Sequence, residues 1–253
     1  MNVPPPIVLP SRFGRVGGVM AALSTRHGGV SGPLLGMNLS FSVGDDEERV
    51  RENRRKFFGA LGIGVETLAL MRQVHGDTIT RVDVPGTFDA CDGIITDQPG
   101  LFLCVTVADC VPVFILDREV RALAVVHAGW RGTAARIVEC AVDALRAAYH
   151  ASPARMEAFV GPAAGKCCYE VGDDIASRFD EACVDRSHGE PRLDLKGANL
   201  LQLVAAGLPR EAVEVHPSCT IHEATVFHSF RRDGTGSGRM MGVAGFPAVT
   251  EKS

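Results

Sequence analysis

The chain has 253 residues, of which 46% are hydrophobic and 22% charged, so it can bury a large core. A formal net charge of −4 and the lack of a Lys/Arg-rich block argue against nucleic-acid binding. The longest apolar run, residues 101–116, is too short to span a bilayer. No long polar linker or internal repeat divides the sequence, so we expect one domain over residues 1–253.

We expect residues 1–17 to form an extended N-terminal segment. Residues 1–10 contain three consecutive prolines and no basic stretch, so no secretory signal is predicted. Eight cysteines occur in a chain that is too long for a small disulfide scaffold, which favours a reducing, cytoplasmic location.

Hydrophobic periodicity and turn residues then predict the elements in chain order. A strand is expected at 18–25. A helix of about four turns should begin at the acids 45–48, which suit its positive end, and finish near Gly59. Its basic cluster, residues 49–56, is interpreted as a solvated face. Further strands are expected near 68–72, 78–84, 93–96, 101–107, 111–116, 121–127, 158–161, 213–215 and 240–244, with helices at 133–149, 173–183 and 198–206.

This order of elements is rich in neighbouring strands and lacks the regular strand–helix alternation of a doubly wound fold. The sequence therefore predicts the α+β class: a single-domain layered sandwich with a mixed β-sheet and flanking helices.

Three short segments each carry one side chain suited to a metal. They are Gln-Val-His-Gly-Asp with His75, Ala-Asp-Cys-Val-Pro-Val with Cys110, and His-Ala-Gly-Trp-Arg-Gly with His127. Catalytic zinc sites keep three protein ligands and leave a fourth position for water or substrate. All three residues fall at expected strand ends, where side chains can face a cleft. We expect them to be metal ligands and catalytic residues, with zinc as the metal and copper as an alternative.

The spacing of Cys110 and His127 allows their geometry to be predicted. Apolar runs at 111–116 and 121–126 flank a polar stretch that suits a tight turn. A turn symmetric about Arg118 and Glu119 would place Cys110 directly opposite His127, with Cβ atoms about 4.5–5.5 Å apart. A slip of one residue would send the two side chains to opposite faces.

The same register has two further consequences. Pro112 has no N–H group, so it must lie at an edge, at a bulge or in an outward-facing position. Apolar residues should also meet across the hairpin, Phe114 with Leu123 and Val111 with Val126.

Structural interpretations of these residues stay open. A lone cysteine in an apolar strand, such as Cys110, is usually a small buried hydrophobe. The adjacent pair Cys167 and Cys168 lacks the C-x-x-C spacing of a redox or zinc motif and is interpreted as structural. Arginines beside turns supply planar forks for phosphate or carboxylate, although each one alone is more often a surface or ion-paired residue. They are Arg26, Arg131 and Arg231.

Gln-Val-His-Gly, Ala-Asp-Cys-Val-Pro and His-Ala-Gly-Trp-Arg-Gly in this order form a highly specific signature. With it the chain resembles, nearly end to end, the YfiH-like family, whose members are called laccase-domain (multicopper polyphenol oxidase-type) proteins, purine nucleoside phosphorylases or peptidoglycan editing factors. Many members read Phe-Phe-Ser-Tyr-Arg-Arg near the C-terminus, whereas residues 227–232 here are Phe-His-Ser-Phe-Arg-Arg. No tyrosine hydroxyl is available there, and His228 is expected to line the pocket instead.

The resemblance implies that the counterparts of His75, Cys110 and His127 bind zinc at the active centre. It implies phosphorolysis of purine nucleosides, deamination of adenosine and phosphorolysis of methylthioadenosine. The expected partners are purine nucleosides and phosphate, without nucleic acid or membrane, for a monomer or small homo-oligomer. A general acid or base is still needed, for which Asp77 and Glu170 are candidates, and phosphate would be held by Arg26, Arg131 or Arg231.

Three other functions remain as alternatives. A copper-dependent polyphenol oxidase would need several copper centres, and the sequence has no H-x-H pair. A thiol hydrolase with Cys110 as nucleophile and His127 as base would act on amide bonds of peptidoglycan precursors without a metal. A non-enzymatic metal-binding or partner protein would turn over no adenosine.

Overall fold

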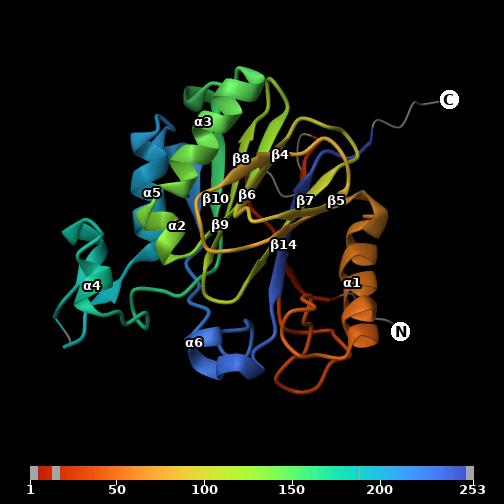
Figure 1. Cartoon of the computed structure of the whole chain (residues 1–253), viewed down its shortest axis with the longest axis horizontal. Helices are drawn as coiled ribbons and strands as arrows, with labels where there is room; N and C mark the ends of the chain where they lie inside the picture. The colour runs from red at the N-terminus through yellow and green to blue at the C-terminus, as the bar shows by residue number, and fades with distance from the viewer. Residues whose placement is uncertain (1–4, 13–17, 188, 249–253) are drawn as a thin grey trace.

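The computed structural model describes residues 5–12, 18–187 and 189–248. Two six-stranded sheets dominate it (Figure 1). The first has the order β1 (Ile7–Val8), β2 (Met20–Ser24), β14 (Met240–Gly245), β7 (Phe102–Val107), β3 (Leu68–Arg72) and β5 (Gly86–Asp89). The second has the order β13 (Val213–Val215), β10 (Glu157–Val160), β8 (Val111–Asp117), β9 (Ala122–Ala128), β6 (Gly93–Thr96) and β4 (Ile79–Arg81).

Each sheet mixes parallel and antiparallel pairs, such as β3 with β7 and β14 with β7 in the first sheet. A separate pair joins β11 (Val184–Asp185) to β12 (Arg192–Leu193). The helices are α1 (Glu47–Leu61), α2 (Trp130–Ala134), α3 (Ile137–Tyr149), α4 (Asp173–Ala176), α5 (Leu195–Ala205) and α6 (Phe230–Asp233).

Three apolar cores stack these elements into four layers. The central core fills the space between the sheets, with Leu103 of the first sheet packed among Phe114 and Val125 of the second. A second core joins the outer face of the second sheet to α3 and α5, and a third joins the outer face of the first sheet to α1. Figure 1 shows these helices on opposite sides of the paired sheets. The predicted α+β sandwich with mixed sheets and flanking helices is confirmed.

Local signals placed the first helix well. Asp46 caps α1 by accepting a hydrogen bond from the Arg49 N–H at 3.0 Å. The helix continues two residues beyond Gly59, because Gly62, with φ of 70°, provides the left-handed C-terminal cap.

Two predicted helices were too long. The segment 133–149 is split into α2 and α3 at Arg136, which has φ of 63°. The Thr133 carbonyl next to this break accepts a hydrogen bond from Gln202 of α5 at 2.8 Å. In 173–183, α4 ends at Ala176, and the Asp180 side chain caps a short 3-10 turn by bonding to the Ala182 N–H.

The strands β5, β11 and β12 were not predicted, and β1 was expected only as extended chain. Part of the N-terminal prediction lies outside the described residues. Of the extended segment expected at 1–17, residues 1–4 and 13–17 belong to that part, while β1 pairs antiparallel with β2. No helix among the described residues is long and apolar enough to cross a bilayer.

Candidate metal centre

Strand alternation brings Cys110 and His127 together at one end of the second sheet. Odd-numbered residues of β8 and even-numbered residues of β9 pack toward the helices, whereas Phe114 and Val125 point into the space between the sheets. His127 shares the inward face with Val125, and Cys110 continues the face of Phe114 just before β8. Both side chains therefore face the gap between the two sheets.

The predicted register of this hairpin was wrong by two residues. His127 lies opposite Pro112, so Cys110 is its diagonal neighbour, and Phe114 pairs with Val125. Val111 pairs with Ala128 rather than Val126. The loop has four residues, 118–121, because Arg121 adopts a left-handed conformation with φ of 52° before pairing resumes at Ala122. A shift of two residues keeps the same face, so the two side chains still meet.

Pro112 lies in a central strand, which the sequence did not lead us to expect. Pairing of β8 with β10 begins only at Val113, so Pro112 lies just beyond the last pair on that side. Its carbonyl accepts a hydrogen bond from the Gly161 N–H at 2.9 Å. The missing N–H is tolerated because the position is near the start of the strand.

Asp92 brings His75 to the same point. Its carboxylate accepts backbone hydrogen bonds from Val74 (3.0 Å), His75 (2.9 Å) and Gly76 (2.8 Å), which fold the loop after β3 around it. His75 has φ of 61°, a conformation that non-glycine residues rarely adopt. The same carboxylate lies 2.7 Å from Nδ1 of His127. One fully buried aspartate thus fixes two of the three predicted ligands.

The three predicted ligands form a compact group. One donor atom from each of His75, Cys110 and His127 lies within 4.8 Å of the others, and the two imidazole rings meet edge to face at 4.8 Å. A Cβ atom added to Gly129 would lie 3.1 Å from the Cys110 sulfur and 3.2 Å from Cδ2 of His75. The glycine in His-Ala-Gly-Trp therefore leaves the space that this group occupies.

The electrostatics of the group favour a thiolate. Burial opposes ionisation of Cys110, but the neighbouring imidazoles outweigh it and lower the pKa of the thiol to about 6. Burial likewise opposes the imidazolium of His127, whereas Cys110 and Asp92 raise its pKa. With Nδ1 facing Asp92, His127 presents Nε2 to the group, which is the orientation common among metal-binding histidines. Two imidazoles and one thiolate fit zinc, and they also fit copper.

A cleft of about 860 Å³ opens over this group. Its walls come from both sheets, from α1 and from α6. The residues that line it are Ser40, Phe41, Ser42, Arg54, Leu70, Met71, Arg72, Gln73, His75, Thr87, Thr106, Ala108, Asp109, Cys110, His127, Tyr169, Phe230, Arg231 and Arg239. The volume lies within the range of small-molecule binding sites.

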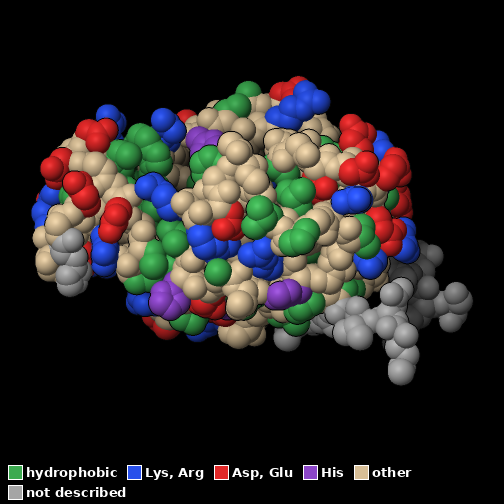
Figure 2. All heavy atoms as spheres, turned by 90° about the horizontal axis from the view of Figure 1, so that it is seen from below, with side chains coloured by type: hydrophobic (Ala, Val, Ile, Leu, Met, Phe, Trp, Pro, Cys, Tyr) green, Lys and Arg blue, Asp and Glu red, His purple; other side chains and the backbone are tan. Residues whose placement is uncertain are grey.

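Three arginines in the cleft stack on aromatic rings. Arg54 lies 4.5 Å from the centre of the Phe41 ring, Arg239 lies 5.4 Å from Phe230, and Arg231 lies 5.1 Å from Tyr169. Burial lowers the pKa of both Arg54 and Arg239, because their guanidinium groups lose solvent. Seen from below, Lys and Arg side chains gather near the middle of the molecular face (Figure 2).

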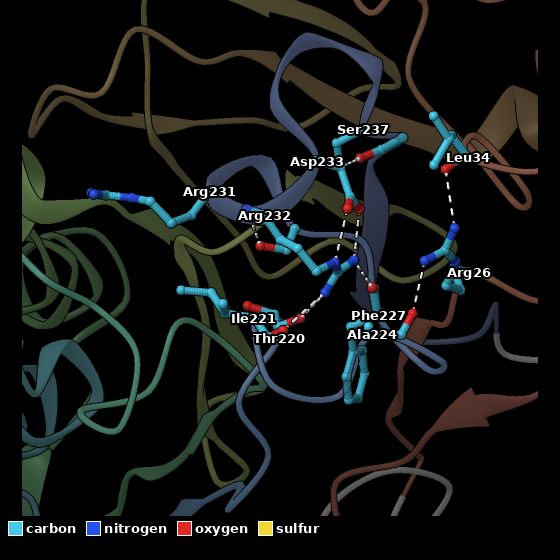
Figure 3. Close-up of polar contacts among 12 residues, drawn as sticks. Arg26, Leu34, Thr220, Ile221, Ala224, Phe227, Arg231, Arg232, Asp233 and Ser237 are labelled. Carbon is cyan, nitrogen blue, oxygen red and sulfur yellow. Dashed lines mark hydrogen bonds and ion pairs between the residues drawn. The ribbon is translucent and has the colours of Figure 1, made fainter.

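Arg231 is the one predicted substrate-binding residue that lines the cleft, and Asp109 holds its loop. Figure 3 shows Arg231 directed away from Arg232, whose guanidinium bonds to Asp233 and to nearby carbonyls. The Asp109 carboxylate accepts hydrogen bonds from the hydroxyls of Thr220 and Ser229 and from the Arg231 N–H. Asp109, the residue before Cys110, therefore holds the Arg231 loop against the cleft.

The structure does not bring the other predicted substrate-binding residues into the cleft. Arg26 bonds to the carbonyls of Ala224, Pro33 and Leu34 (Figure 3). Arg131 stacks on its neighbour Trp130, Glu170 pairs with Arg192, and Asp77 is exposed outside the lining. His228 is fully buried and does not line the cleft, and burial lowers its pKa to about 3.

Sequence reasoning missed four residues that shape the site. Asp92 acts through the backbone of a distant loop, for which no local spacing exists. Arg54 belongs to the basic cluster interpreted as a solvated face. Arg239 and Tyr169 carry no motif of their own, although Tyr169 follows the conspicuous cysteine pair.

Known proteins with this sequence pattern and fold are found by comparison. Residues 20–247 match the family described as multi-copper polyphenol oxidoreductase laccase. A relative from Geobacillus stearothermophilus named purine nucleoside phosphorylase YlmD is 36% identical, covering 90% of each chain. A relative from an unknown prokaryotic organism named adenosine deaminase RL5 is 33% identical, covering 86% of this chain and 90% of its own.

A solved structure supports the same relationship at the level of the fold. The crystal structure of Bacillus licheniformis hypothetical protein YfiH superposes with a TM-score of 0.90 at 33% identity, covering 97% of both chains. The family match, the relatives and this structure agree with the signature and with the layered fold. The chain therefore belongs to the laccase-type family of multi-copper polyphenol oxidoreductase-like proteins that includes YfiH and YlmD.

Proposed function

We propose that this protein is a zinc-dependent purine nucleoside phosphorylase of the cytoplasm, which also deaminates adenosine and phosphorolyses methylthioadenosine. Relatives named for phosphorolysis and for adenosine deamination support these reaction classes. The observation that carries the proposal is the convergence of His75, Cys110 and His127 on a cleft lined by aromatic residues and arginines.

The three ligands would hold the zinc ion, and Asp92 would orient His127 toward it. When bound, zinc supplies Lewis acidity and activates a water molecule. Because Asp92 also holds the backbone of His75, the spacing of both imidazoles is set before any ion arrives. Such prior orientation raises metal affinity.

Phosphorolysis requires phosphate beside C1′ of the ribose. One phosphate oxygen forms a bond to C1′ while the glycosidic bond breaks. The electron pair of the broken glycosidic bond passes to the purine, which gains a proton. Arg54 and Arg239 form no ion pair with any described residue and lose solvation in the cleft, so an anion would restore their electrostatic balance. Arg231 completes a set of donors suited to phosphate.

The aromatic residues fit the other half of the substrate. Phe41, Phe230 and Tyr169 line the cleft, and a purine base could stack on rings of this kind. In deamination, the oxygen of a water molecule would form a bond to C6 while the C6–N bond breaks, and the amino group would leave the same cleft as ammonia. Asp77 and Glu170 lie elsewhere, and the acid or base groups that line the cleft belong to Asp109, Tyr169 and the metal-binding group.

A thiol hydrolase is a second candidate that one observation favours. Cys110, His127 and Asp92 form a chain of thiol, imidazole and buried carboxylate that matches the logic of a cysteine nucleophile with its base and orienting acid. A hydrolase of amide bonds in peptidoglycan precursors would keep its activity after metal removal. The phosphorylase would lose it.

The experiment is product analysis with purified protein of known metal content. Adenosine, inosine and methylthioadenosine are incubated with and without phosphate, before and after stringent chelation. Phosphate-dependent release of base and ribose 1-phosphate, lost on chelation and restored by zinc, is the expected result. Turnover of no nucleoside by zinc-loaded protein would refute the proposal.

Replacement of arginines tests the phosphate site separately. Arg54→Gln should raise the KM for phosphate, because it removes a charged donor from the cleft. Arg55→Gln is the matched control, since Arg55 is the next residue of α1 but pairs with Glu52 at the surface. Equal effects of both substitutions would place phosphate elsewhere.

A further inference from the structure

A second group of potential metal ligands lies outside the site described above. The sulfur atoms of Cys167, Cys168 and Cys219 all lie within 4.8 Å of one another. Cys167 is exposed, Cys168 is half-buried and Cys219 is buried, so the group extends from solvent into the protein. The pair that the sequence led us to interpret as structural is thus joined by a third thiol about 50 residues later.

The fold leaves space for these sulfurs. A bridge between Ala163 and Cys219 aligns the two segments, and a turn with the Cys168 N–H bonded to the Gly165 carbonyl directs the cysteine pair back toward Cys219. A Cβ atom on Gly165 would lie 3.3 Å from the sulfur of Cys219 and 3.4 Å from that of Cys167. A side chain at this position would fill the space between the thiols.

Backbone groups around Cys219 favour its thiolate, which is the form that binds metals. Its sulfur accepts a hydrogen bond from the Gly165 N–H at 3.2 Å and further backbone hydrogen bonds from Ile221 and His222. The buried Lys196 ammonium, which is bonded to the carbonyls of residues 216–218, interacts electrostatically with Cys219 and Cys167.

The charged groups beside the three thiols do not oppose the binding of a cation. The Glu223 carboxylate accepts a hydrogen bond from the Cys219 N–H at 3.1 Å, so its charge and that of Lys196 offset each other. Burial raises the pKa of the Cys167 and Cys168 thiols, so a bound cation would displace their protons and take the resulting thiolates as ligands. Three thiolates select thiophilic ions such as zinc over magnesium or calcium, and zinc commonly completes four ligands with a further donor or water.

We propose that Cys167, Cys168 and Cys219 form a second, thiolate site that binds a thiophilic cation of the zinc class. The site is separate from the centre at Cys110. The ion would tie together two segments that continue into the cleft, because Tyr169 follows Cys168 and Thr220, which bonds to Asp109, follows Cys219. Its role is to hold these segments in place.

The test measures zinc directly and is independent of nucleoside turnover. All variants carry Cys110→Ala, which removes the thiol of the first centre. In this background, reduced protein is dialysed against buffered zinc and the bound zinc is measured, and cobalt is added to a parallel sample. The Cys110→Ala protein should show a thiolate-to-cobalt charge-transfer band, and Cys219→Ser in this background should lose it together with about one equivalent of zinc.

Two further variants keep the result interpretable. Cys140→Ser replaces a half-buried cysteine that belongs to neither group, and it should keep the band and the zinc. Cys168→Ser should behave as Cys219→Ser does, even though it leaves the Cys219 contacts with Gly165, Ile221 and His222 intact. Unchanged far-ultraviolet circular dichroism identifies the variants that fold.

Equal zinc content and equal spectra in the Cys110→Ala and the Cys110→Ala, Cys219→Ser proteins would overturn the proposal. It would also be overturned if the reduced protein bound no zinc while the air-oxidised protein formed a disulfide between Cys219 and Cys167 or Cys168. That outcome would make the group a redox pair.

Discussion

Replacement of Asp92 by asparagine perturbs the metal-binding group through a residue that touches no metal. In the native protein one carboxylate oxygen faces the His75 N–H and His127 Nδ1, and the other faces the N–H groups of Val74 and Gly76. An asparagine has a single acceptor oxygen. If its NH₂ group faces Val74 and Gly76, it opposes two N–H donors at a fully buried position. If it faces the other way, it opposes the His75 N–H and makes Nδ1 of His127 an acceptor, which moves the imidazole proton to Nε2, the atom that faces the metal-binding group.

The magnitude follows from these contacts. Each buried donor that loses its acceptor costs about 1–3 kcal/mol, and hydrogen bonds to a charged group are at the upper end. We therefore expect Asp92→Asn to lower the free energy of unfolding by about 2–6 kcal/mol. Zinc affinity should fall by about 10–100-fold, because loss of a partner that orients a histidine ligand has this effect in other sites.

The assay is urea unfolding of the metal-free protein, combined with zinc competition against a chromophoric chelator. Asp109→Asn is the matched control. Asp109 is also a buried carboxylate with three donors, but two of them are the hydroxyls of Thr220 and Ser229, which can turn and accept from an amide. Its loss of stability should be about 1 kcal/mol. Equal losses of stability and of zinc affinity in the two variants would refute the reasoning.

Three further outcomes are expected. Gly129→Ala should lower zinc affinity at least about tenfold, because the added methyl group meets Cys110 and His75. The backbone at Gly129 has a φ of −75°, which suits alanine, so the substitution does not strain the chain. Gly59→Ala is the control, since it has open space around it and should keep the zinc affinity, which isothermal titration measures for both variants. His75→Ala, Cys110→Ala and His127→Ala should each remove the zinc of this centre and the nucleoside activity while circular dichroism stays unchanged; full activity in any of them would contradict its role. Phe41→Ala should raise the KM for adenosine, because stacking on a base is worth about 1–3 kcal/mol, and it should leave the rate at which a chelator removes zinc unchanged. An unchanged KM would remove Phe41 from the base site.

The central part of the site could be predicted because it depends on local patterns. Alternation along two strands placed Cys110 and His127 on one face, and this survived an error of two residues in register. The error itself came from Arg121, whose left-handed conformation lengthens the loop and which no turn signal announces. The third ligand, His75, could be named from its segment, but its position depends on Asp92.

The substrate-binding residues could not be predicted as well, because they depend on packing between distant segments. Arg54 is one turn from arginines that face solvent, and only the packing of α1 against the first sheet turns it toward the cleft. Arg26 and Arg131 lie beside suggestive turns, yet neither of them lines the cleft. Short sequence motifs identified which chemical groups could act, whereas the direction in which each side chain points depends on the tertiary structure.

The most direct test of the central claim is anomalous diffraction at the zinc edge from crystals of the zinc-loaded protein. The geometry predicts a peak bonded to His75, to the Cys110 sulfur and to Nε2 of His127, at the floor of the cleft. A fully loaded crystal with no anomalous peak among these three side chains would contradict it.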